Sequence, residues 1–205
     1  PGDVDEVAAI LVTHDHVDHT HGPSQAPILV RSGAPLYGPP PSVDTATAWL
    51  DDWDLATDQL RTVTPGDTVE VGPFTVHVED AHDPDADDPV SFVVDHDAGT
   101  FFHGGDSKPA ESFAEVGERH DIDVGVLALG SRGRVPPDGA VRKWYCDHDE
   151  MAETARDLQF DRLVPTHWDM WKRMTADPTA VLDTVRGFEF PRSVSILEAG
   201  DSIDI

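Results

Sequence analysis

The sequence predicts an α+β fold in which β-sheets pack together and helices cover them from outside. Between residues 60 and 103, short alternating segments are separated by turn signals such as "PGD", "VGP" and "DAG", which is typical of an antiparallel meander. After Asp106, strand and helix patterns alternate, and this order favours packed sheets with helices outside them. The chain has 205 residues and no linker-like segment, so we expect one domain spanning residues 1–205.

The remaining elements follow from apolar patterning and capping residues. Before the meander, the pattern predicts a buried strand over 7–13, the end of a short helix over 28–32, a strand over 35–37 and a helix over 43–50. After the meander, it predicts helices over 112–119, 148–158 and 178–186, and strands over 124–129, 163–165 and 194–197.

The composition is strongly acidic, with 40 Asp and Glu against 14 Lys and Arg and a formal net charge of −26. The acid excess runs along the whole chain, so we interpret it as adaptation to a salt-rich cytoplasm, where self-repulsion is screened. The alternative is an acidic protein that binds cations or a basic partner. Nucleic acid is not expected as a partner, because phosphate contacts need a basic surface.

Cysteine usage and hydropathy give the expected compartment. Cys146 is the single cysteine, so no disulfide can form within the chain. No segment approaches the roughly 20 apolar residues of a membrane-spanning helix, and the acidic start lacks the basic region of a signal peptide. We therefore expect a cytoplasmic protein without a membrane partner, provided that the chain begins where the natural one does.

The segment "VTHDHVDH" places potential metal ligands directly after the first predicted strand. Alternate residues of an extended segment point the same way, so His14 and His16 can hold one cation. Where the chain turns beyond the strand, Asp18 and His19 can face a second. Imidazoles and carboxylates suit zinc, manganese or iron(II). A polar surface loop is the alternative, but four donors within six residues make it the weaker interpretation.

Three further donors follow predicted strands. His82 follows "FTVHVEDA", Asp106 ends "TFFHGGD" and His167 follows "RLVP". Each alone is weak evidence, since a lone histidine is more often an ordinary core or surface residue. Together with the first motif, they repeat one arrangement of a donor after a strand four times.

These residues, in this order, resemble the metallo-β-lactamase-fold hydrolases. The segments "VTHDHVDH", "VTPGDTVEV", "GGDSK" and "THWDMWKRMTADP" resemble the L-ascorbate-6-phosphate lactonase branch of that family. The resemblance covers nearly the whole chain and implies an αββα four-layer sandwich. The chain begins only thirteen residues before His14, so we expect the usual N-terminal strands of the family to be lacking. A homo-oligomer could then cover the exposed sheet edge.

The resemblance also implies a centre of two divalent metal ions, with zinc favoured and manganese or iron as alternatives. His14, His16 and His82 would hold the first ion. Asp18, His19 and His167 would hold the second, and Asp106 would bridge both. Asp18 and Asp106 would be catalytic, Asp18 by orienting the nucleophilic water. The implied reaction is attack by a metal-bound hydroxide on an ester, lactone or phosphoester of a small anionic substrate.

Basic residues are scarce but cluster after the predicted strand 124–129, in "GSRGRVPPDGAVRK". Arg132, Arg134 and Lys143 are candidates to bind an anionic substrate, and Lys108 is a further candidate beside Asp106. A solvated loop that balances local acidic charge is the alternative.

Two other functions stay open at the level of sequence. One is a phosphodiesterase or nuclease of the same fold, against which the acidic composition argues. The other is a non-catalytic metal-binding or partner-binding protein. Because every expected ligand position holds a donor, the sequence favours an enzyme over a protein that has lost its activity.

Overall fold

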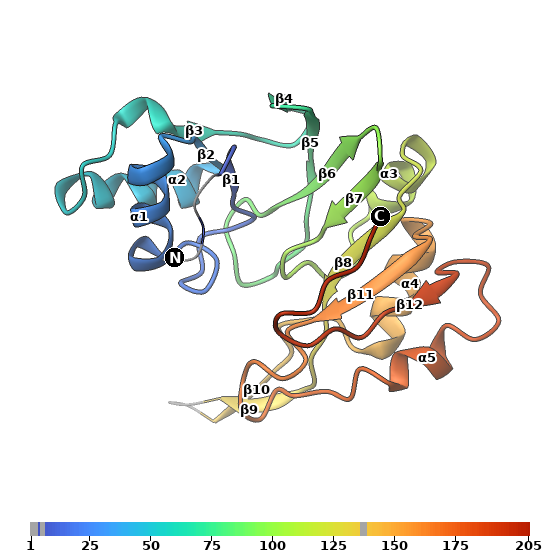
Figure 1. Ribbon diagram of the computed structural model, residues 1–205. Coiled ribbons are helices and arrows are strands. Elements are labelled where there is room, and N and C mark those ends of the chain that lie inside the picture. The colour runs from blue at the N-terminus through green and yellow to red at the C-terminus, as the bar shows by residue number, and fades with distance from the viewer. Residues whose placement is uncertain (1–3, 5–6, 136–138) are drawn as a thin grey trace.

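Two β-sheets and a separate hairpin form the frame of the molecule (Figure 1). The computed structural model describes residues 4, 7–135 and 139–205. The smaller sheet has three parallel strands in the order β1 (Ile10–Leu11), β2 (Leu36–Gly38) and β3 (Leu60–Thr62). The larger sheet has seven, in the order β12 (Ser193–Val194), β11 (Arg162–Thr166), β8 (Val124–Ala128), β7 (Gly99–His103), β6 (Val90–His96), β5 (Phe74–Asp80) and β4 (Thr68–Val71). The hairpin pairs β9 (Gly133–Val135) with β10 (Ala140–Arg142).

Helices lie outside both sheets, which confirms the αββα arrangement. Helices α1 (Gly22–Ser32) and α2 (Pro40–Thr47) lie with the smaller sheet, and α3 (Phe113–Arg119), α4 (His148–Asp157) and α5 (Ala180–Thr184) lie with the larger one (Figure 1). Two short 3₁₀ turns, Ala48–Asp51 and Thr57–Gln59, connect α2 to β3. No helix among the described residues is long and apolar enough to cross a membrane.

Three groups of buried side chains hold these layers together. One group lies between the larger sheet and α3 to α5 and includes Phe102, Phe113 and Phe160. A second lies between the smaller sheet and its helices. The third joins the two sheets, where Tyr37 of β2 packs with residues of β5 and β6. Each sheet is therefore apolar on both faces over part of its area, as the layered fold requires.

The predicted meander is confirmed from β4 onward, whereas its first segment, β3, pairs parallel with β2 in the smaller sheet. Strands β4, β5, β6 and β7 pair antiparallel in sequence order. Alternation along β5 buries Val76 and Val78 in the layer between the sheets, so His77 and Glu79 point to the opposite face.

Element boundaries differ from the prediction where apolar patterning is weak. The first helix extends from Gly22, with a proline in its first turn, and ends where Gly33 adopts φ of 67°. The last helix and last strand are shorter than predicted, covering Ala180–Thr184 and Ser193–Val194.

The strand directions bring the ends of distant segments to one edge. β7, β8 and β11 run parallel to one another, and β5 runs the same way because two antiparallel pairings separate it from β7. Polar residues that follow these strands therefore meet at the same edge, where the segment after β1 also arrives.

Candidate metal centre

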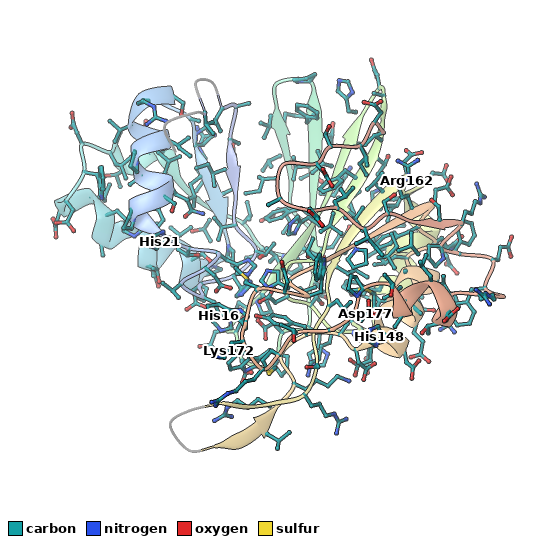
Figure 2. All side chains as sticks on the ribbon, turned by 60° about the horizontal axis from the view of Figure 1, so that its bottom comes forward. His16, His21, His148, Arg162, Lys172 and Asp177 are labelled. Carbon is teal, nitrogen blue, oxygen red and sulfur yellow. The ribbon has the colours of Figure 1, made fainter. Side chains whose placement is uncertain are left out.

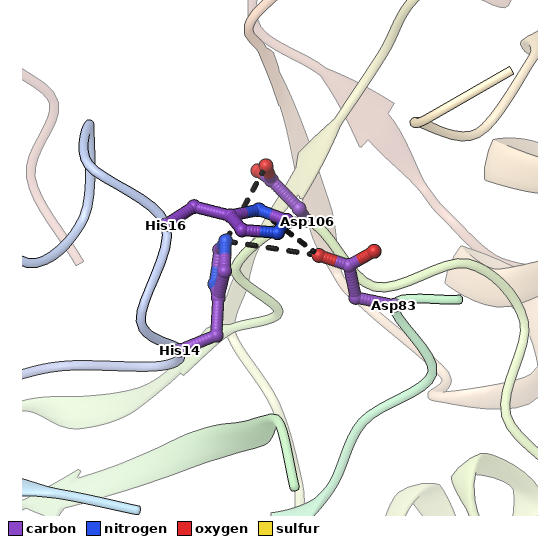
Figure 3. Close-up of side chains that lie close together, drawn as sticks. All are labelled: His14, His16, Asp83 and Asp106. Atoms are coloured by element: carbon purple, nitrogen blue, oxygen red, sulfur yellow. Dashed lines mark ion pairs between the residues drawn. The ribbon is translucent and has the colours of Figure 1, made fainter. Parts of the chain in front are cut away.

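The first group of potential ligands combines the segment after β1 with the segments after β5 and β7. It contains His14, His16, Asp83 and Asp106, whose ligand atoms all lie within 4.8 Å of one another (Figure 3). His14 Nε2 lies 3.7 Å from Asp83 Oδ2 and 3.7 Å from Asp106 Oδ2. His16 Nδ1 lies 3.6 Å from Asp83 Oδ2. Two imidazoles and two carboxylates thus converge on one point.

The second group contains Asp18, His19, Asp106 and His167, again within 4.8 Å. His19 Nε2 lies 3.3 Å from Asp106 Oδ1 and 3.7 Å from Asp18 Oδ2. His167 Nε2 lies 3.5 Å from Asp106 Oδ1. The backbone N–H groups of His19 and Thr20 both donate to the carbonyl of His16, so the chain turns after the first group and presents Asp18 and His19 to the second.

Asp106 belongs to both groups and uses a different oxygen for each. Its Oδ2 faces His14, while its Oδ1 faces His19 and His167. A carboxylate in this position can bridge two cations, which is the geometry of two-metal hydrolytic sites.

The donor atoms themselves fit a pair of metal ions. Five buried atoms that face into the two groups have no hydrogen-bond partner: His14 Nε2, Asp18 Oδ2, His19 Nε2, Asp83 Oδ2 and Asp106 Oδ1. Leaving a buried polar atom unpaired costs about 1–3 kcal/mol, and more for a charged group. Mixed imidazole and carboxylate donors suit zinc, manganese and iron. The residues present therefore fit the metal ions that the sequence predicted.

The outer ring nitrogens of His16 and His14 are anchored. His16 Nε2 lies 3.0 Å from the carbonyl oxygen of Asp85, and His14 Nδ1 lies 3.0 Å from Thr13 Oγ1. When the outer N–H donates to such a partner, the inner nitrogen is unprotonated and its lone pair is free to bind a metal ion.

Backbone geometry around the centre is constrained. Gly105 has φ of +56°, and a Cβ added there would lie 2.6 Å from Thr13 Oγ1, the atom that anchors His14. The Gly105 N–H donates to Nδ1 of the half-buried His103, which fixes the turn before Asp106. His167 has φ of 62°, a region that non-glycine residues rarely adopt and that concentrates at functional sites.

His82 does not join either group, and Asp83 stands in its expected place. The carbonyl of His82 accepts from the Lys108 N–H at 2.8 Å, and the His82 N–H donates to Ser107 Oγ at 2.8 Å. This pairing turns the His82 ring outward, where its Nδ1 lies 3.0 Å from the Pro109 carbonyl oxygen. Neighbouring residues of an extended segment point to opposite sides, so Asp83 points inward. Sequence patterning alone does not distinguish the two positions.

Burial and neighbouring charges set the protonation of the centre. Burial, with the nearby His19, lowers the pKa of His14 to about 3, so its ring stays neutral. Burial raises the pKa of Asp83. Burial alone would raise the pKa of Asp106, but the neighbouring imidazoles of His19, His167 and His14 outweigh burial and lower that pKa.

His19 is expected to release a proton when a cation binds to the second group. Burial alone would lower its pKa, but Asp106, Asp18 and Asp83 outweigh burial and raise it above 6.5. Near pH 6.5 the His19 ring of the metal-free protein is therefore mostly in its cationic form, with both nitrogens protonated. Affinity for the metal falls as pH falls through this raised pKa. Calorimetric titration with Zn²⁺ in buffers of different ionisation enthalpy measures the protons released. Equal apparent enthalpies in all buffers would show that His19 is already neutral.

A cavity of about 490 Å³ opens onto both groups. It is lined by His16, Val17, Asp18, Asp83, Asp85, Asp106, Arg142, Trp144, Tyr145 and Trp171. Its walls are thus acidic on the metal side, with an arginine and aromatic rings beside them. Trp168, by contrast, packs against the core under the larger sheet.

The candidate substrate contacts are mostly not in this cavity. Lys143 Nζ pairs with Asp147 at 2.5 Å and Glu150 at 2.6 Å at the start of α4, so its charge is directed away from the centre. Arg132 is exposed and Lys108 is half-buried, and neither lines the cavity. Arg134 lies on β9, and its side chain falls outside the described part of the chain. Arg142, in the same basic cluster, is the cation that lines the cavity among the described residues.

Other histidines have structural partners. His21 Nδ1 lies 2.7 Å from Ser24 Oγ at the start of α1, and His148 Nε2 lies 2.8 Å from the carbonyl oxygen of Asp177 (Figure 2). Figure 2 shows His16 apart from both. Neither His21 nor His148 belongs to a ligand group.

Comparison with known families agrees with this geometry. The family described as "Beta-lactamase superfamily domain" matches residues 1–168. The chain belongs to this superfamily. The resemblance predicted from its motifs is therefore confirmed, and so is the metallo-β-lactamase fold.

Individual proteins resemble this chain in sequence or in fold. The "probable L-ascorbate-6-phosphate lactonase UlaG" of Escherichia fergusonii is 30% identical over 202 residues, covering 88% of this chain and 54% of its own. The chain thus spans about half the length of the curated relatives it matches. Igni18, a metallo hydrolase of Ignicoccus hospitalis, superposes with a TM-score of 0.74 at 18% identity, over 96% of this chain and 78% of its own. The metallo-β-lactamase fold protein YhfI of Bacillus subtilis superposes with a TM-score of 0.66 at 16% identity, over 95% of this chain and 76% of its own.

Proposed function

We propose that this chain is the catalytic part of a metal-dependent hydrolase that cleaves an ester, lactone or phosphoester of a small anionic molecule. The observation that carries the proposal is the sharing of Asp106 between two ligand groups at the floor of one cavity. A cavity of about 490 Å³ is the size of a small-molecule site.

Two divalent ions, with zinc favoured, are the proposed cofactors. His14, His16 and Asp83 would hold one, while Asp18, His19 and His167 would hold the other, with Asp106 between them. When bound, such ions lower the pKa of water and polarise the bond under attack. Buried ligand atoms that lack hydrogen bonds support this assignment.

The side chains of the cavity supply the remaining functions. Asp18 lines the cavity and can orient the attacking water with the carboxylate oxygen that does not face His19. Burial and the nearby charges of Asp106 and Asp18 raise the pKa of Tyr145, so its hydroxyl stays protonated and can donate a hydrogen bond to the substrate. Arg142 can pair with an anionic group at the cavity wall.

The likeness to L-ascorbate-6-phosphate lactonases favours a lactone of a sugar phosphate as substrate. The test loads the protein with Zn²⁺ or Mn²⁺ and measures hydrolysis of L-ascorbate 6-phosphate, an uncharged lactone and a generic phosphodiester. Turnover of the phosphorylated lactone supports the proposal. Turnover of the phosphodiester alone would indicate a phosphodiesterase, and bound metal without turnover of any substrate would indicate a binding protein.

Arg142→Ala is expected to lower kcat/KM for an anionic substrate about 10-fold, the loss of one charged hydrogen bond, and to change kcat/KM for a neutral ester less than about 2-fold. Arg186→Ala is the matched control, because that exposed arginine pairs with Asp183 on α5 and lies outside the cavity lining. Equal losses on the anionic and the neutral substrate would show that Arg142 does not recognise charge.

Adaptation to high salt belongs to the same proposal and rests on the net charge of −26. At about 1 M salt, charges are screened beyond roughly 3 Å, so self-repulsion of the folded chain is relieved. The thermal midpoint of the metal-free protein is expected to rise when KCl is raised from about 0.1 M to this range. A midpoint that stays constant or falls would contradict salt adaptation.

A further inference from the structure

The larger sheet carries another set of histidine and carboxylate side chains, which shares no residue with the Asp106 centre. His77 of β5, Asp95 of β6 and His120, which follows α3, form this outer histidine cluster. We propose that the outer histidine cluster is a separate binding site for one divalent transition-metal ion, with Zn²⁺ as the reference ion.

Strand register explains why these residues meet. His77 pairs with Val93 across the β5–β6 ladder, so Asp95 is its diagonal neighbour on the same face. That face is opposite to the one on which Val76 and Val78 are buried between the sheets. The end of α3 then brings His120 over the same face, with its ring centroid 4.9 Å from that of His77.

The separations of the donor atoms suit a metal ion. His77 Nε2 lies 3.1 Å and His120 Nδ1 lies 3.8 Å from the same oxygen, Asp95 Oδ2. Three ligand atoms, one per residue, lie within 4.8 Å of one another. Tetrahedral zinc with bonds of about 2.0–2.2 Å keeps its ligand atoms roughly 3.3–3.6 Å apart, so small side-chain adjustments would complete the site.

The far side of each ligand is also supported. His77 Nδ1 lies 3.3 Å from Thr68 Oγ1, and His120 Nε2 lies 3.7 Å from Glu79 Oε1. The second oxygen of Asp95, Oδ1, accepts a hydrogen bond from the Thr100 hydroxyl at 2.8 Å. Metal-binding histidines and carboxylates characteristically have such outer partners, which fix the tautomer and the ring orientation.

Glu79 is itself held in place as a partner for His120. Arg119 Nη2 donates to Glu79 Oε2 at 2.6 Å. The resulting chain, from Glu79 through His120 to the proposed ion, is the carboxylate–histidine–metal arrangement.

An ion-pair network without metal is the competing explanation. It accounts for His77 beside Asp95, a single good contact at 3.1 Å. The second imidazole nitrogen faces the same oxygen at 3.8 Å, which is within ion-pair range but too long for a hydrogen bond. A shared cation explains both contacts at once.

The test compares the zinc content of the wild-type protein with that of the double variant His77→Gln, His120→Gln. Each folded protein is dialysed against micromolar Zn²⁺ and measured by elemental mass spectrometry, and Co²⁺ substitution gives an independent absorption signal. We expect one zinc ion fewer per chain in the double variant, and the same difference when Asp106→Ala is present in both proteins. His96→Gln is the control, since that exposed histidine of β6 lies outside the cluster, and it should keep the wild-type zinc content.

Equal zinc content and equal Co²⁺ spectra in the wild-type protein and the double variant would overturn the proposal. If the double variant does not fold, Asp95→Asn serves instead, because the amide oxygen can still accept from Thr100 while the ligand charge is removed. The comparison does not depend on hydrolysis, so its failure would leave the proposed function of the Asp106 centre untouched.

Discussion

Asp106→Ala is expected to abolish hydrolysis, with a loss of kcat/KM on the order of 1,000-fold or more. The reason is that, among the residues that the structure describes, Asp106 is the one that serves both ligand groups, with one oxygen facing His14 and the other facing His19 and His167. Its removal takes away the carboxylate that the two groups share, whose negative charge would offset the repulsion between two bound cations. Zinc content at the centre should therefore fall together with activity.

The control for this variant is Asp52→Ala, which removes an exposed carboxylate that belongs to neither ligand group. It should keep both activity and metal content. Wild-type activity in Asp106→Ala, measured on protein with the wild-type circular dichroism spectrum, would refute the shared role of this carboxylate.

Asp83→Ala and His82→Ala are expected to have very different effects although the residues are neighbours. Asp83 Oδ2 faces both His14 and His16, so its loss should weaken metal binding at the first group about 100-fold. His82 contacts the carbonyl of Pro109, so its loss should cost roughly 1 kcal/mol of stability and leave metal affinity within about 2-fold of wild type.

Competition with a chromophoric chelator measures both affinities in the same buffer, and thermal unfolding measures the stability of each variant. The pair is its own matched control, because the two positions share one backbone segment. Weaker metal binding in His82→Ala than in Asp83→Ala would reverse the assignment and restore the ligand that the sequence predicted.

Most of the candidate centre could be predicted from sequence because its donors directly follow strands. The spacing of His14, His16, Asp18 and His19 is enough to indicate two cations, and the turn after His16 is where the prediction expected it. The choice between positions 82 and 83 depends on a backbone bridge to Lys108, a contact 26 residues away that local patterning does not encode.

The substrate contacts could not be predicted in the same way. Lys143 and Arg142 are adjacent in a basic cluster, but the first pairs with Asp147 and Glu150 at the capped start of α4 and the second lines the cavity. The same two acidic residues close the capping box of that helix, so local charge pairing decides the direction of Lys143.

The fold was predictable to the level of layers because the meander and the strand–helix alternation are strong patterns. The length of the first strand was not. Residues 7–13 form an apolar run, yet the register with β2 covers only Ile10–Leu11, and the Val12 N–H makes the last backbone hydrogen bond to Tyr37. Pairing between strands, and not apolar character, sets where a strand ends.

The most direct test of the central claim is a crystal structure of the zinc-loaded protein with anomalous diffraction recorded on both sides of the zinc absorption edge. The account predicts two anomalous peaks at this edge of the sheet, about 3.5–4 Å apart, with the Asp106 carboxylate between them. A single peak, or two peaks that do not share Asp106, would contradict a centre built around this residue.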